Sequence, residues 1–82
     1  MARRWTLVAH PNYLQALRVA IQNPDDRFRL AEALWDKLEE TDNPTLGATP
    51  NKDNQYELVL YGRVILYEIM EAEGKIRLLL LE

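Results

Sequence analysis

The chain has 82 residues, of which 48% are apolar and none is cysteine. This length is enough for one domain, spanning residues 1–82, and the apolar content excludes a disordered chain. The net charge of −3 does not favour nucleic-acid binding, because such proteins usually carry a basic face. No apolar run approaches the roughly 18 residues of a membrane span. The lack of cysteine fits a reducing compartment, so we expect a cytoplasmic protein without membrane contact.

The first elements predicted are a strand and a helix. Residues 3–8 alternate as a short strand, with Trp5 and Leu7 on the same side. Asn12 is expected to cap a helix over residues 13–22, because its side chain accepts hydrogen bonds from free backbone amides.

A second helix follows after Asn23-Pro24, where the residue before proline avoids the helical conformation. Asp25 or Asp26 is expected to cap this helix, which continues to about residue 40. Its apolar stripe, at helical spacing, is predicted to contain Phe28, Ala31, Leu34, Trp35 and Leu38.

The second half of the chain predicts a loop and three strands. Residues 41–54 show no periodicity and are expected to be a loop. Residues 55–61, 63–71 and 76–81 read as strands separated by turns at Gly62 and Gly74. The predicted order is β-α-α-β-β-β, an α+β fold in which an antiparallel sheet packs on a helical hairpin.

Few residues are available for catalysis or metal binding. The chain has no serine, no cysteine and a single histidine, His10, which we expect to be a turn residue. A nucleophilic triad built on serine or cysteine is therefore excluded, which leaves only threonine as a hydroxyl nucleophile. A structural zinc site with its usual set of about four Cys or His ligands is excluded as well. The glycines are isolated and form no phosphate-binding loop. We expect no metal site and no cofactor.

Three segments of the C-terminal half carry a resemblance to a known family. They are Tyr-Glu-Leu-Val-Leu at 56–60, Gly-Arg-Val-Ile-Leu-Tyr-Glu-Ile at 62–69 and Lys-Ile-Arg-Leu-Leu-Leu at 75–80. Together they resemble the three closing strands of the RelE/ParE toxin superfamily, and the preceding strand and helices fit the same order. The resemblance implies a RelE/ParE-like fold and a small toxin held by an antitoxin protein. RelE-like members are ribosome-dependent mRNA endonucleases, and ParE-like members poison DNA gyrase.

Arg63 is the only candidate catalytic residue that the resemblance supplies, because it matches the family's arginine after the turn glycine. The nucleases usually carry lysines on the preceding strand, where this chain has Glu57 and Val59. They also continue with an arginine and a tyrosine beyond the last strand, where this sequence stops at Glu82. Three residues separate Arg63 from Tyr67, one more than is usual in the family. Because RNA cleavage needs cations beside the phosphate, we expect no nuclease activity.

The last strand is apolar on both sides. In an alternating strand, Leu79 and Leu81 lie opposite Leu78 and Leu80, so one pair needs cover from outside the core. We therefore predict that Leu79, Leu81 and the strand-end Arg63 contact a protein partner, either an antitoxin-like protein or a second copy of the chain. The alternative is an active toxin, acting as an mRNA endonuclease or a gyrase inhibitor.

Overall fold

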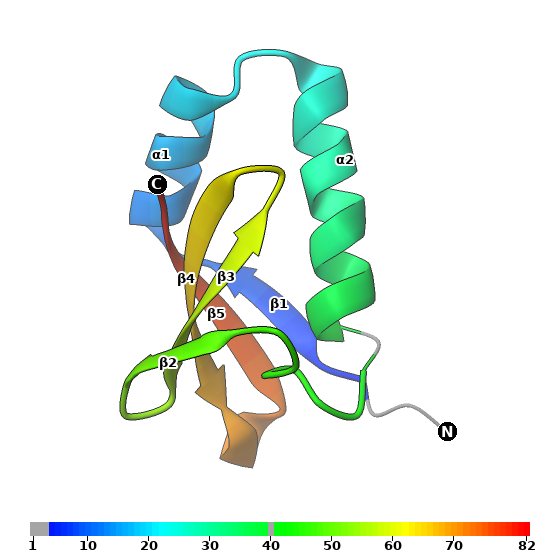
Figure 1. Cartoon of the computed structure of the whole chain (residues 1–82), viewed down its shortest axis with the longest axis vertical. Coiled ribbons are helices and arrows are strands. Elements are labelled where there is room, and N and C mark those ends of the chain that lie inside the picture. The colour runs from blue at the N-terminus through cyan, green and yellow to red at the C-terminus, as the bar shows by residue number, and fades with distance from the viewer. Residues whose placement is uncertain (1–3, 40) are drawn as a thin grey trace.

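The computed structural model describes residues 4–39 and 41–82. Its elements in chain order are β1 (Thr6–Ala9), α1 (Pro11–Ala20), α2 (Pro24–Leu34), a π-helical turn (Trp35–Glu39), β2 (Thr49–Lys52), β3 (Gln55–Leu60), β4 (Arg63–Met70), a 3-10 turn (Glu71–Glu73) and β5 (Lys75–Leu81). The strands form one sheet in the order β1-β5-β4-β3-β2. The predicted α+β fold, with a helical hairpin ahead of a mostly antiparallel sheet, is confirmed. Figure 1 shows α1 and α2 side by side, with the tip of the β3–β4 hairpin reaching up between them.

The sheet has one parallel contact, between its first and last strands. β1 pairs in parallel with β5, from Thr6 opposite Lys75 to Ala9 opposite Leu78. All the other neighbouring strands pair antiparallel. The predicted start of the first strand at residue 3 and the predicted end of the second helix at residue 40 lie outside the described residues.

Both helices begin at a different cap from the one predicted. The side chain of His10, and not Asn12, caps α1: its Nδ1 accepts a hydrogen bond from the Asn12 amide at 3.0 Å. Asn23, and not Asp25 or Asp26, caps α2, with its Oδ1 accepting from the Asp25 amide at 2.9 Å. Each cap precedes a proline at the first helical position, where the missing amide hydrogen costs nothing. The two aspartates instead lie in the first turn of α2, where their charge favours the helix dipole.

The assignment of Asn23 as the cap of α2 predicts how substitutions at Asn23 and Asn12 change the free energy of unfolding. We expect Asn23→Ala to lower the free energy of unfolding by about 1 kcal/mol, because the Asp25 amide loses its acceptor. Asn12→Ala should change it by less than about 0.5 kcal/mol, because Asn12 is an exposed residue inside α1. Urea unfolding of both variants measures the difference. Equal losses in the two variants would contradict the assignment of Asn23 as the cap.

The predicted 41–54 loop contains a strand. β2 pairs antiparallel with β3, placing Thr49 opposite Glu57 and Pro50 opposite Tyr56. All four residues of β2 are exposed, and the strand contains a proline, which is tolerated at a sheet edge because no ladder amide is required there. The prediction of a structureless loop was therefore wrong for these residues. Their polar side chains give no apolar alternation by which a strand could be recognised.

The β3–β4 and β4–β5 pairings differ in their regularity. β3 and β4 pair without interruption and meet at a two-residue turn, Tyr61-Gly62, in which both residues have positive φ (52° and 74°). That conformation matches the twist of a hairpin. β5 contains a bulge: Leu66 pairs with Leu80 and Tyr67 with Leu78, so Leu79 has no partner on β4. The bulge shifts the alternation of the residues after it by one position.

The core lies between the two helices and one face of the sheet. Its most buried side chains come from both layers: Trp5, Tyr13, Leu30, Leu34, Leu38, Leu58, Ile65, Tyr67, Ile76, Leu78 and Leu81. In α2 the buried stripe is Leu30, Leu34 and Leu38. The predicted stripe was right for Leu34 and Leu38 and wrong for Phe28, Ala31 and Trp35, which are exposed.

Candidate protein-binding surface

The face of the sheet opposite the core carries an apolar patch, which we call the open face. It is built from Val59 of β3, Val64 and Leu66 of β4 and Leu80 of β5. The register places Val59 beside Val64 and Leu66 beside Leu80, so the four side chains form one group. Val59 is 63% exposed, and the other three are half-buried. An apolar group of this kind, on the sheet face opposite the one on which the described helices α1 and α2 pack, is typical of a binding surface.

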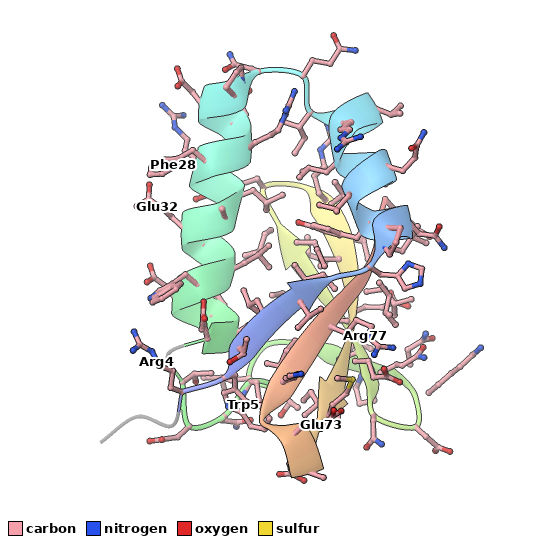
Figure 2. All side chains as sticks on the ribbon, turned by 180° about the vertical axis from the view of Figure 1, so that it is seen from behind. Arg4, Trp5, Phe28, Glu32, Glu73 and Arg77 are labelled. Atoms are coloured by element: carbon pink, nitrogen blue, oxygen red, sulfur yellow. The ribbon has the colours of Figure 1, made fainter. Side chains whose placement is uncertain are left out.

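Charged residues border the open face. Glu68 and Arg77 are register partners on β4 and β5, and their side chains lie 3.8 Å apart. Glu57 of β3 is exposed beside Leu66. Figure 2 shows Arg77 beside β5 on the side remote from α2. The Glu68–Arg77 pair is partly exposed and so adds little stability, but it sets a polar rim around an apolar centre, the usual arrangement of a protein interface.

The residues predicted to bind a partner are placed by the structure in three different settings. Leu79 is the bulged, half-buried residue of β5. Leu81 is 5% exposed and belongs to the core, so the expected alternation was wrong for it: the bulge at Leu79 turns Leu80 to the open face and Leu81 inward. The open-face residues Val59, Val64, Leu66 and Leu80 were not selected from the sequence. Alternation within each strand sets Val59 apart from Leu58 and places Val64 with Leu66, but the pairing that brings the three together comes from the structure, and Leu80 could not be assigned without the bulge.

Arg63 lies on the helix side of the sheet. Its side chain is on the same face of β4 as the fully buried Ile65 and Tyr67. The Nη2 of Arg63 donates a 3.1 Å hydrogen bond to the carbonyl of Ala20, at the end of α1. It borders a hollow of about 360 Å³ that Arg29 and Tyr61 also line. The sheet therefore separates Arg63 from Glu57 and Val59, which face the other way. A bulge in the β3–β4 pairing could have turned these side chains to the same face, but the pairing is regular, so Arg63 stays on the opposite face from Glu57 and Val59.

A larger hollow of about 630 Å³ lies at the far end of the sheet, between residues 42–45 and the end of β4. Tyr67 anchors this loop, because its hydroxyl donates a 2.6 Å hydrogen bond to the carbonyl of Pro44. The ring of Tyr56 stacks on Tyr67, with centroids 5.9 Å apart. Burial, together with the neighbouring Tyr56 hydroxyl, raises the pKa of Tyr67 to about 12. The lining is largely acidic or polar and includes Glu68 and Glu71.

Within residues 4–39 and 41–82, no three His, Cys, Asp or Glu side chains are grouped so that they could hold a metal ion. No helix in the same two stretches is long and apolar enough to cross a membrane.

Comparisons with known proteins identify the fold. No protein-family model and no curated protein matches the sequence. The structure matches a chain of the RelBE2 toxin–antitoxin complex from Mycobacterium tuberculosis, with a TM-score of 0.68 over 96% of each chain. The two sequences are 14% identical, a level at which the match establishes a common fold. The RelE-like fold expected from the resemblance of the closing strands is thus confirmed.

Proposed function

We propose that this chain is a RelE-like protein-interaction module that binds an antitoxin-like protein partner and has no nuclease activity. The observation that carries the proposal is the open face, where four apolar side chains lie together inside a polar rim. The match to a chain of a toxin–antitoxin complex supports a partner of this kind, because that fold is bound to another protein there. Val59, Val64, Leu66 and Leu80 are the residues that we assign to the interface, with Leu79 beside them.

The proposed lack of nuclease activity rests on charge and placement. Phosphate-cleaving sites hold several cations around the reacting phosphate to stabilise its developing charge. On the open face, Glu57 and Val59 stand where the family nucleases carry lysines, and Arg77 is already paired with Glu68. The candidate Arg63 is directed to the helix side, where it binds a backbone carbonyl. An exposed carboxylate such as Glu57 would repel an RNA backbone.

The partner-binding proposal is tested with Leu66→Arg, and with Val19→Arg as the matched control. Leu66 is at the centre of the open face, and Val19 is a 69% exposed residue of α1. The binding partner in the assay, titrated calorimetrically, is any antitoxin-like protein encoded beside the gene of this chain, and the absence of such a gene would count against the proposal. We expect Leu66→Arg to weaken binding at least about 30-fold, because a charge would be buried in an apolar contact. Val19→Arg should leave the affinity unchanged. Equal affinity of both variants would reject the open face as the interface.

An active toxin is the second candidate, and the similarity to a chain of a toxin–antitoxin complex favours it. Induced expression in a bacterial host separates the two. We expect normal growth and intact messenger RNA, both for the unaltered chain and for Arg63→Ala. Growth arrest that Arg63→Ala abolishes would establish the nuclease function and reject the inactive module. Arrest with intact messenger RNA and inhibited DNA supercoiling would instead establish gyrase poisoning.

A further inference from the structure

The outward side of α2 carries a second apolar surface, distinct from the open face. Phe28 is 65% exposed, Trp35 is 40% exposed, and Ala31 between them is also exposed. Their spacing places them on one stripe of the helix, which runs beside the buried stripe of Leu30 and Leu34 and is turned away from the sheet. We call these residues, together with Glu32 and Asp36, the α2 outer surface. Figure 2 shows Phe28 and Glu32 both pointing away from the body of the molecule.

This stripe has no role in the described core. A surface helix normally needs one apolar stripe, and α2 already fills that role with its leucines. The outer stripe also borders a hollow of about 270 Å³, lined by Ala31, Glu32, Trp35 and Asp36. The small side chain of Ala31 between two aromatic residues leaves a gap into which a ridge on another helix can fit. The shape therefore suits an α-helix as the occupant.

The charges beside the stripe indicate the kind of helix. Glu32 and Asp36 are exposed and lie along the stripe, where they line the hollow beside Ala31 and Trp35. They also line a second hollow on their other side, toward the β3–β4 hairpin, which they share with the basic Arg29 and Lys37. The carboxylates thus lie between the apolar stripe and the two basic residues. A helix seated on the stripe would meet the carboxylates first. Lysine or arginine beside its apolar ridge would be attracted, whereas carboxylates would be repelled.

The chain itself supplies an example of such a contact. The guanidinium carbon of Arg4 lies 5.3 Å from the centre of the Trp35 ring, a cation–π arrangement. Figure 2 shows Arg4 near the C-terminal end of α2, close to the same outer side. The stripe therefore accommodates a basic side chain over an aromatic one at one end. Trp35 is also the first residue of the π-helical turn, a distortion that occurs frequently at functional sites.

A second copy of the chain is a poor occupant of this surface. In an isologous contact α2 would lie against its own copy, which places Glu32 and Asp36 of one chain near the same carboxylates of the other. Like charges brought together this way disfavour the contact. An anionic membrane surface is disfavoured for the same reason.

We propose that the α2 outer surface docks a cationic amphipathic helix of a partner protein, with apolar residues on Phe28, Ala31 and Trp35 and basic residues beside Glu32 and Asp36. The site is independent of the open face. It recognises a helix laid along α2, whereas the open face presents a sheet. The chemistry required of the occupant is a ridge of leucine-sized side chains flanked by lysine or arginine.

The probe that tests this proposal is a synthetic helical peptide of leucine and lysine, compared with a leucine–glutamate peptide of the same pattern. We expect the lysine peptide to bind at least tenfold more tightly in calorimetric titration at low salt. Phe28→Ser/Trp35→Ser should weaken its binding at least tenfold. Glu32→Gln/Asp36→Asn should weaken binding and flatten its dependence on salt concentration. Asp53→Asn/Glu73→Gln removes the same number of exposed carboxylates elsewhere and should leave binding unchanged.

Other outcomes would reject the proposal. Equal binding of the two peptides would show that charge does not select the occupant. Equal weakening by the Asp53/Glu73 control would show that net charge, and not this surface, attracts the peptide. A chain dimer that Phe28→Ser/Trp35→Ser dissociates would identify a second copy as the occupant. Leu66→Arg should leave peptide binding intact while it weakens the open-face partner, so failure of one proposal is distinguishable from failure of the other.

Discussion

Replacing Ile65 with alanine is expected to lower the free energy of unfolding by about 2–5 kcal/mol. Ile65 is 0% exposed and lies on β4, the central strand of the sheet, between β5 and β3. Its removal leaves a cavity that neighbours on two strands and the helix layer cannot fill without shifting. A chain of this size has a total stability on the order of 4–12 kcal/mol, so the loss is a large share of it. Chemical denaturation followed by far-ultraviolet circular dichroism measures the change.

Val59→Thr is the matched control for Ile65→Ala. Val59 lies on the neighbouring strand β3 but faces outward and is 63% exposed. Threonine keeps the branched β-carbon that favours a strand, so the expected change is within about 0.5 kcal/mol. If Val59→Thr destabilised the chain as much as Ile65→Ala does, the assignment of the inward and outward faces of the sheet would be wrong.

The second large effect is a loss of stability at high pH through Tyr67. Its pKa is raised from 10.0 to about 12 in the folded chain. Between these two values the folded chain holds a proton that the unfolded chain has lost, so the free energy of unfolding falls as the pH rises. A shift of about two pKa units corresponds to about 3 kcal/mol once the pH has passed both values. Urea unfolding at about pH 7 and about pH 11.5 measures most of this loss.

Tyr67→Phe separates the titration of Tyr67 from other alkaline effects. The variant lacks the hydrogen bond to the Pro44 carbonyl and should lose about 1 kcal/mol at neutral pH. It should then lose less stability than the unaltered chain on going to pH 11.5. A smaller fall remains, because burial also raises the pKa of Tyr13. Tyr61→Phe, at a 73% exposed position, should keep the full fall. An identical fall in Tyr67→Phe and in the unaltered chain would rule out Tyr67 as its source.

The closing strands were predictable because their side chains alternate. Leu58 and Val59 have opposite burial, as their pattern indicates, and β3 and β4 are found within a residue of their expected bounds. The pattern fails in the leucine run at the end of β5. Four consecutive leucines do not show which of them face the core, because all four are equally apolar. The sequence therefore gave no indication of the bulge at Leu79 or of the inward orientation of Leu81. The assignment of Leu80 to the open face depended on that bulge.

The predictions for α2 failed for a different reason. Hydrophobicity alone assigned Phe28 and Trp35 to the core, yet the stripe with Leu30 fills the space under the helix. Two apolar stripes on one helix cannot be ranked from the sequence, because only the neighbouring sheet decides which one is buried. The helix caps were ambiguous in a similar way, since several adjacent polar residues could each accept the same amide hydrogen bonds.

The parallel pairing of β1 with β5 has a consequence for synthesis of the chain. β1 leaves the ribosome before the other described strands, but β5, which lies beside it in the described sheet, leaves after them. Until β5 is available, β1 and β4 each lack the strand that lies between them. The sheet therefore closes as a late, long-range event, which slows folding and leaves two strand edges unpaired meanwhile. We expect the nascent chain to depend on chaperones during that interval, because unpaired strand edges and exposed apolar surface favour aggregation.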